Sequence, residues 1–399
     1  MESCIRRSKL AGLFATAALL GACGGGGSST SDTSVPPPTS SNPPPSPAPI
    51  PALTPAPTPP QAIAGDPLFS SSCSATPTRS SIGPFSTQAG DCFVTYQITP
   101  QELADFHANY TQAAVRTKVL NAVAANFLGR IDSVVVIVDE SDQERGSLPY
   151  GINYPVQSCS VHNNACPRFG RLGNLWLTAR TYISAGPSLH ELLHGFHTGM
   201  ATDTTANYTI PTAVSGHWGF SSAGGQHGGW APGTLVSTGA NAYQAKAPTA
   251  IAPFVSLAGF GTFANGGNSI PFSNLELWTM GLIPDSALQA VQVAENAVST
   301  GSGTFTATAI TTYTPAQIIA RVLPAARPST STPRAFRALV VVATTSGALP
   351  AATVSSLNSD IEQFTMRATP TIAATGYNLW TASGMSATIQ MANATELAR

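Results

Sequence analysis

The sequence predicts an α+β fold. A capped stretch of helical periodicity begins at Thr99, and an uninterrupted apolar run from Ser133 to Val138 has the length and β-branched composition of a buried strand. A second strand is expected at 175–179, and a helix follows that begins at Ser184 or Gly186 and includes residues 188–197. Helix, strand, strand and helix therefore succeed one another in the first half of the folded region.

The first helix is expected to start at Thr99-Pro100-Gln101-Glu102. Threonine is a preferred N-cap residue, proline suits the first turn, and Glu102 stands where it completes a capping box. Apolar residues then recur at helical spacing to about residue 128, so one long helix or two joined helices fill this stretch.

A short helix is expected to begin at Ser273 or Asn274 and to end at Gly281. Glu276 shares one face of this helix with apolar side chains. A carboxylate on an apolar face needs a partner such as a metal or a cation.

The last third of the chain is expected to form a smaller C-terminal α/β subdomain, residues 287–399, that closes the cleft. Periodicity predicts helices at 287–298, 315–323 and 354–366, a buried strand at 337–343, and short strands around Ile372 and Ile389. We find neither a repeat nor a second catalytic motif in this part.

The N-terminus predicts a lipoprotein signal peptide, residues 1–22. Basic residues precede an apolar run from Leu10 to Leu20 that is too short for a membrane span. The following Gly21-Ala22-Cys23 resembles a bacterial lipobox, which implies cleavage before Cys23, lipidation of that residue and an outer-membrane destination. Residues 23–65, rich in Gly, Ser, Thr and Pro, are expected to form a disordered tether.

Composition excludes several classes of function. Charged residues make up 9% of the chain and the formal net charge is −1, so no basic patch indicates nucleic-acid binding. We expect a monomer that acts on a protein or peptide substrate.

In an exported chain, an even set of cysteines outside the signal and the lipid anchor favours two disulfides, with local pairing expected: Cys73 with Cys92 and Cys159 with Cys166.

The segment His190-Glu191-Leu192-Leu193-His194 matches the pattern HExxH. On a helix, residues four apart lie about 40° apart in projection and about 6 Å apart along the axis, so His190 and His194 can bind one metal ion. Glu191 falls about 100° from His190, where a general base for a zinc-bound water belongs.

This motif resembles the active-site helix of the zincin metallopeptidases. The resemblance implies a zincin-like catalytic domain over residues 66–286, with a mixed sheet and an active-site helix. It also implies that His190 and His194 bind Zn²⁺ and that Glu191 is the catalytic acid/base. A looser resemblance links residues 216–218 and 275–284 to other exported bacterial HExxH proteins, which suggests that both stretches belong to the active site.

The sequence leaves the third zinc ligand open. Glu276 is favoured, because in gluzincins a Glu on a later helix completes the site. His217 is the main alternative; if Glu276 binds zinc, His217 is expected to act in catalysis by stabilising the oxyanion. Tyr208 or Tyr243 is a weaker candidate for that second role.

Three further residues are candidates for the third zinc ligand. His197 shares the face of His190 but lies about 10 Å along an unbroken helix from it, too far for one ion. It can serve only if Gly195 breaks the helix. His227 and Asp203 are the remaining candidates.

The sequence therefore predicts a surface-anchored zinc endopeptidase that hydrolyses peptide bonds through a zinc-activated water, with Glu191 as general base. The alternative is a surface lipoprotein that binds or adheres without catalysis and keeps a structural or degenerate metal site.

Overall fold

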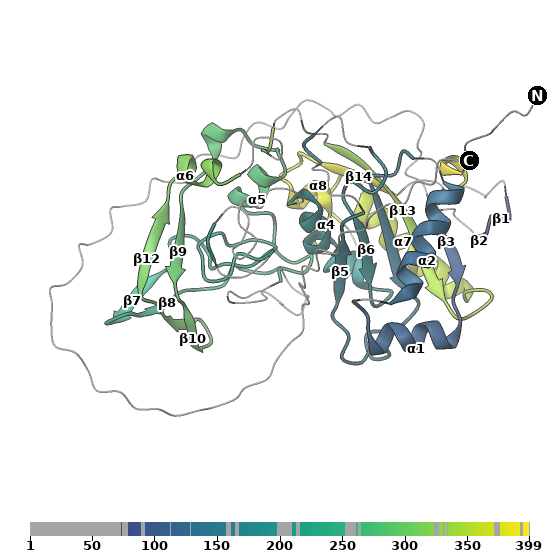
Figure 1. Ribbon diagram of the computed structural model, residues 1–399, viewed down its shortest axis with the longest axis horizontal. Coiled ribbons are helices and arrows are strands. Elements are labelled where there is room, and N and C mark those ends of the chain that lie inside the picture. Colours follow the sequence, from purple (N-terminus) through teal and green to yellow (C-terminus); the bar gives the residue numbers. More distant parts are fainter. Residues whose placement is uncertain are drawn as a thin grey trace, which may run out of the picture.

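The computed structural model describes residues 73, 79–88, 92–111, 113–127, 129–156, 161–163, 167–197, 210–212, 216–251, 261, 265–322, 327–329, 332, 334–370, 376–391 and 394–398. These residues form a large lobe built on one sheet and a small lobe, residues 216–322, rich in β-strands (Figure 1). The predicted signal peptide, the tether with Cys23 and the Cys159–Cys166 pair lie outside the described residues.

The large lobe contains an eight-stranded mixed sheet, which confirms the predicted α+β class. The order is β1-β2-β3-β13-β4-β6-β5, and β14 pairs with β13 beside this path. Strands β3, β13, β4 and β6 run parallel, whereas β1, β2 and β5 pair antiparallel with their neighbours. The bounds are β1 (Ser81–Ile82), β2 (Phe85–Thr87), β3 (Phe93–Gln97), β4 (Ser133–Val138), β5 (Gly151–Tyr154), β6 (Asn174–Leu177), β13 (Ala335–Thr344) and β14 (Thr388–Met391).

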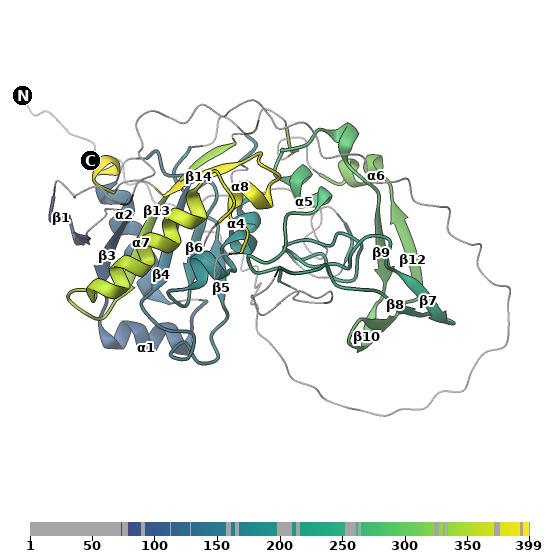
Figure 2. The same cartoon turned by 180° about the vertical axis from the view of Figure 1, so that it is seen from behind.

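Helices cover both faces of this sheet (Figures 1 and 2). One face packs on α1 (Pro100–Ala108), α2 (Ala114–Asn126) and α9 (Ala394–Leu397). The other packs on α3 (Tyr182–Ala185), α4 (Ser188–Phe196), α7 (Ala351–Thr365) and α8 (Leu379–Ala382). Strand β4 is buried on both faces, since its alternate side chains enter the two cores, which explains its unbroken apolar sequence.

The prediction of a separate C-terminal subdomain is wrong. Strand β13 lies in the centre of the main sheet, between β3 and β4, and α7 packs on the same core as α4. The strand itself is close to its predicted bounds. Its apolar run from Ala338 to Ala343 suits a position covered by helices on both faces, and that position draws the end of the chain into the large lobe.

The small lobe comes from the middle of the chain instead. It contains β7 (Val236–Gly239), β8 (Ala242–Gln244), β9 (Val291–Glu295), β10 (Val298–Gly301), β11 (Thr304–Thr306), β12 (Ala309–Tyr313), α5 (Asn274–Thr279), α6 (Pro315–Ala320) and the 3₁₀ turn η1 (Asp285–Ala287). The predicted helix at 287–298 is wrong, because β9 and β10 occupy it. In β9, Val291 and Val293 are buried and the intervening Gln292 is less so, the period of a strand that pairs with β12.

The small lobe includes two hairpins of similar sequence. Residues 236–245 and 298–307 both begin Val-Ser-Thr-Gly, and β8 pairs with β11 so that Tyr243 faces Phe305 at the centre of a four-stranded sheet. Their hydrogen bonds are equivalent: Ala245 N donates to Gly303 O at 2.9 Å, and Ala307 N donates to Asn241 O at 3.0 Å. The two hairpins are thus related by an approximate twofold axis.

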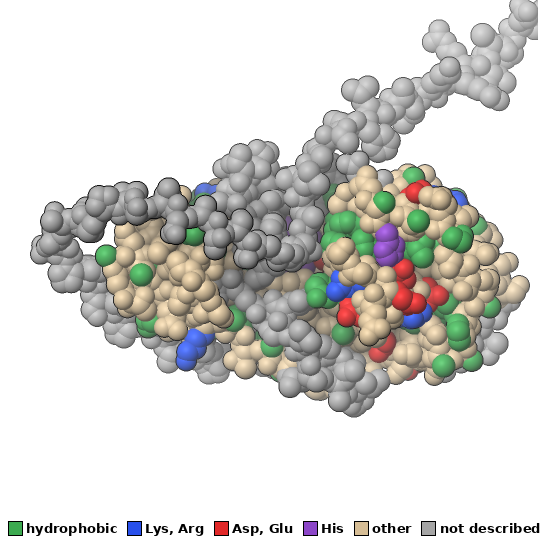
Figure 3. Space-filling view, turned by 90° about the horizontal axis from the view of Figure 1, so that it is seen from below, with side chains coloured by type: hydrophobic (Ala, Val, Ile, Leu, Met, Phe, Trp, Pro, Cys, Tyr) green, Lys and Arg blue, Asp and Glu red, His purple; other side chains and the backbone are tan. Residues whose placement is uncertain are grey.

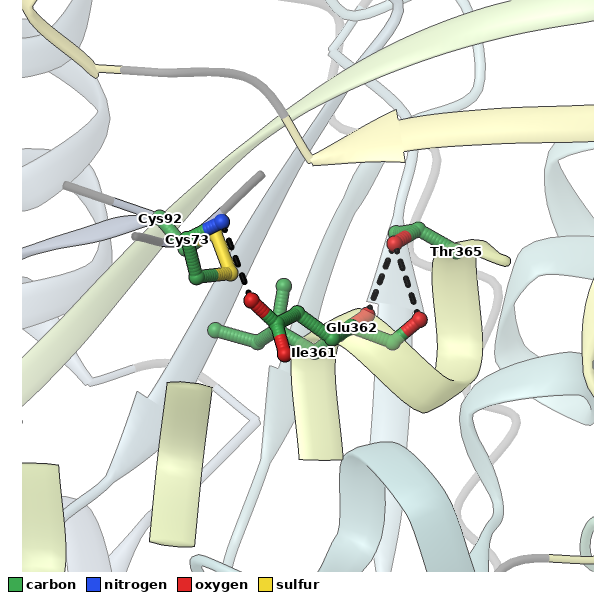
Figure 4. Close-up of a disulfide and its surroundings, with 5 residues drawn as sticks. All are labelled: Cys73, Cys92, Ile361, Glu362 and Thr365. Atoms are coloured by element: carbon green, nitrogen blue, oxygen red, sulfur yellow. Dashed lines mark hydrogen bonds between the residues drawn. A yellow bond between two sulfur atoms is a disulfide. The ribbon is translucent and has the colours of Figure 1, made fainter. Parts of the chain in front are cut away.

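A disulfide joins Cys73 and Cys92, as local pairing predicts, with their Cα atoms 4.9 Å apart. The Cys73 backbone N–H also donates to Glu362 Oε1 at 3.1 Å (Figure 4). Since Cys92 directly precedes β3 and Glu362 lies in α7, these two links hold the start of the described chain against the helix that covers the sheet.

Charge is unevenly distributed over the surface. In Figure 3, acidic and basic side chains gather with a histidine on the large lobe, and the visible face of the small lobe is mostly uncharged. The acidic side chains after β4 are paired: Asp139 and Glu144 with Arg180, Asp142 with Arg145, and Glu140 with His107. Among the described residues, no helix has both the length and the apolarity needed to cross a membrane.

Candidate metal centre

Helix α4 carries the HExxH motif and begins at Ser188, later than the favoured start at 184–186. Gly186, at φ +101°, and Pro187 separate it from α3. Ser188 and Glu191 have the spacing of a capping box, which would occupy Glu191, but no such box forms. Asn268 caps the helix instead, since its Oδ1 accepts from Leu189 N at 3.1 Å and its Nδ2 donates to the Ile183 and Ser184 carbonyls.

His190 and His194 meet His217, which arrives from the loop that follows α4. One ring nitrogen of each lies within 4.8 Å of those of the other two. The Nε2 atoms of His190 and His217 are 3.2 Å apart. Both of these rings are buried. This group of three, His190, His194 and His217, is called the first histidine group below.

The loop residue Gln226 fixes the proton on His190. The Gln226 carbonyl lies 2.7 Å from His190 Nδ1 and can only accept a hydrogen bond, so Nδ1 carries the proton and Nε2 carries the lone pair. A metal-binding histidine is commonly oriented in this way by a carbonyl on its other nitrogen. His190 therefore presents the correct nitrogen toward His217.

Burial keeps these rings neutral. It holds the pKa of His190 and of His194 well below the usual value for histidine, and the neighbouring histidines add to the effect. Neutral imidazoles are the form that binds metal ions, so His190 and His194 are prepared to ligate at neutral pH.

Glu191 follows His190 in α4 and is almost fully buried. Burial raises the pKa of its carboxyl to about 8, opposed by a hydrogen bond from the Asn153 backbone. The Glu191 side chain packs on the edge strand β5: a β-carbon added to Gly151 would lie 3.0 Å from Glu191 Cγ. The carboxyl is thus held between α4 and the end of the sheet.

The structure does not bring Glu276, the favoured third ligand, to the histidines. Its fully buried carboxylate accepts four hydrogen bonds: Oε1 from Trp218 Nε1 and His227 N, both at 2.8 Å, and Oε2 from Gln226 N at 3.0 Å and Ser273 N at 2.8 Å. With four donors the carboxylate is saturated. Glu276 thus positions the loop that holds His190.

The close contact between Glu276 and this loop requires glycine at position 225. A β-carbon added to Gly225 would lie 1.9 Å from Glu276 Oε2, so no larger residue fits there without movement. The sequence contained the signal for this role, because Ser273 and Glu276 have the S-x-x-E spacing of a capping box and form one in α5.

Two further histidines stand beside the first group. His197, the C-cap residue of α4, and His227 form a second set with His194, with ring nitrogens again within 4.8 Å of one another. His197 does not join His190, as the helical distance predicts. The sequence makes His227 a candidate ligand, but its glycine-rich surroundings do not indicate which histidines it joins.

Three other residues are candidates from the sequence. Asp203 and Tyr208 lie outside the described residues. Tyr243 is in β8 of the small lobe, where its ring stacks on Phe305 with the centroids 5.7 Å apart. Comparison with known proteins finds no family model that matches this chain, and neither a curated protein nor a solved structure that is similar to it.

Proposed function

We propose that this protein is a zinc-dependent endopeptidase with a zincin-like catalytic domain, tethered outside the cell through lipidated Cys23. The observation that carries the proposal is the meeting of the HExxH helix with His217. His217 is the third ligand in this proposal, in place of Glu276, and Zn²⁺ is the metal.

The first histidine group fits zinc in both spacing and chemistry. Two nitrogens that bind one tetrahedral zinc at about 2.0–2.1 Å lie about 3.3 Å apart, close to the 3.2 Å between the Nε2 atoms of His190 and His217. Three imidazoles leave a fourth position for water or substrate, as in catalytic zinc sites.

A zinc ion held there would lower the pKa of its bound water to about 7 and polarise a carbonyl oxygen. Glu191 supplies the proton transfer: its carboxylate takes a proton from the attacking water and returns it to the leaving amine. A zinc ion bound there would lower the carboxyl pKa of Glu191 from the value set by burial, which would give Glu191 the charged form that a base needs.

Strand β5 offers a place for an extended peptide. It ends the main sheet, and its outer edge is not paired within the described part of the chain. Gly151 in this strand adjoins Glu191. An extended segment that adds to a strand edge gains main-chain hydrogen bonds, and here its backbone would pass the general base.

Metal removal tests the proposal. We expect 1,10-phenanthroline to abolish casein hydrolysis by the full chain, and stoichiometric Zn²⁺ to restore it after dialysis. The His217→Ala variant should lose zinc affinity by at least about 100-fold, since it removes a direct ligand rather than an outer-shell partner. Hydrolysis that survives complete metal removal would overturn the proposal.

The second candidate is a binding lipoprotein with a structural metal. The burial of His190 and His217 favours it, because structural zinc sites are closed to solvent. The two functions differ at Glu191, which a structural site does not need.

A further inference from the structure

We propose that the histidine cluster holds a second divalent metal ion, on His194, His197 and His227. This second histidine group lies beside the first and shares His194 with it. The inference rests on the proposed function only for the first ion. The ligands of the second ion would all be imidazoles, which suit borderline divalent ions such as Zn²⁺.

His227 supplies the main observation. Its Nε2 lies 3.0 Å from the His190 carbonyl oxygen, which can only accept, so Nε2 carries the ring proton. The lone pair is therefore on Nδ1. That atom is buried and has no hydrogen-bond donor within the described residues. A buried lone pair without a donor is destabilising unless a water or a metal ion satisfies it.

The contacts of His197 assign its lone pair in the same way. Thr279 Oγ1 donates its only proton to the Glu276 carbonyl at 2.8 Å, so it accepts from His197 Nε2 at 3.3 Å. Nδ1 of His197 then carries the lone pair. The ring centroids of His197 and His227 are 4.9 Å apart, and one ring nitrogen of each lies within 4.8 Å of the other and of His194.

His194 can serve both groups. Its ring lies close to both, with centroid distances of 5.2 Å to His217 and 4.1 Å to His227. In the described structure no hydrogen bond commits either of its ring nitrogens. Binding one ion on each nitrogen requires loss of the ring N–H proton to solvent, which leaves a bridging imidazolate.

Metal stoichiometry tests the second site. The full chain, with free thiols alkylated by iodoacetamide, is stripped with a chelator, loaded with Zn²⁺, freed of excess by gel filtration and measured by plasma mass spectrometry. We expect two zinc ions in the wild type and one in His227→Ala. The control His107→Ala, which removes a histidine on the other side of the large lobe, should retain both ions.

The outcomes separate this inference from the proposed function. One zinc in the wild type, lost in His217→Ala and kept in His227→Ala, overturns the second site and leaves the first. One zinc that is lost in His227→Ala and kept in His217→Ala overturns the first histidine group as a zinc site and the claim of two ions, and it assigns the single ion to the second histidine group. His197→Ala provides a second variant if His227→Ala does not fold, and it should also bind a single ion. The wild-type count decides without any variant.

Discussion

The Glu191→Gln variant is expected to lose peptide hydrolysis by a factor of about 10²–10⁴, the usual contribution of a general acid–base group. Glutamine keeps the size of the side chain and cannot accept the proton of the attacking water. The histidines are untouched, so zinc content should match the wild type. Casein hydrolysis and metal content, measured on the same preparation, check both halves of the expectation.

A suitable control is Glu140→Gln, because that carboxylate bonds His107 of α1 and lies outside both histidine groups. It should hydrolyse casein at the wild-type rate. Full zinc content together with undiminished hydrolysis in Glu191→Gln would remove Glu191 from the mechanism. Full zinc with no hydrolysis in the wild type either would favour the binding lipoprotein.

In the metal-free protein, the contribution of Glu191 to stability should fall as pH rises from 6.5 to 8. Burial raises the pKa of Glu191 from 4.5 to about 8, so over this range its carboxyl binds more protons in the folded state than in the unfolded state. The buried histidines, whose lowered pKa values act in the opposite direction, are shared by the wild type and Glu191→Gln, so the comparison of the two isolates Glu191. The loss amounts to about 1.5 kcal/mol, and Glu191→Gln should remove it. Urea unfolding of both metal-free proteins at several pH values measures the difference; equal slopes would contradict the assigned burial.

The second large effect is expected at Glu276. Its replacement by alanine removes the acceptor of three backbone N–H groups and the Trp218 indole. Each donor left without a partner costs about 1–3 kcal/mol, so the melting temperature should fall by on the order of 10 °C. Zinc affinity should fall about 10- to 100-fold, because the carbonyl of Gln226 no longer orients His190.

Glu276→Gln separates positioning from stability. The amide oxygen of the introduced glutamine still accepts hydrogen bonds, whereas its amide nitrogen faces N–H donors. We therefore expect the melting temperature and the zinc affinity of Glu276→Gln to lie between those of the wild type and Glu276→Ala. Cobalt-substituted protein should keep the absorption of an imidazole-bound ion in Glu276→Gln, with a shifted band. If Glu276 is a ligand after all, the cobalt spectrum of the wild type should show a carboxylate oxygen and the metal should be lost outright in Glu276→Ala.

Local sequence patterns predict most elements of the large lobe. The Thr99 cap, the apolar run of β4 and the amphipathic α7 each follow from short-range rules, and the structure contains all three. The position of β13 cannot be obtained this way. Its apolar sequence fits any buried strand, and only long-range pairing with β3 and β4 places it at the centre.

The same limit applies to the metal centre. HExxH locates two histidines because one helical turn fixes their spacing, whereas His217 and His227 reach the helix through loops whose paths no periodicity describes. The prediction of Glu276 as a zinc ligand gave weight to the apolar face of its helix. Its S-x-x-E spacing with Ser273 indicates a capping box instead. A buried carboxylate can be satisfied by backbone N–H groups as well as by a metal.

The central place of β13 also has a consequence in time. A ribosome delivers β3 and β4 early, and in the described structure they do not pair with each other; each pairs with β13. Until residues 335–344 emerge, the sheet exists as two unjoined halves with open edges. Every histidine of the cluster has been synthesised by then, so metal ligands become available to the nascent chain before its core can close.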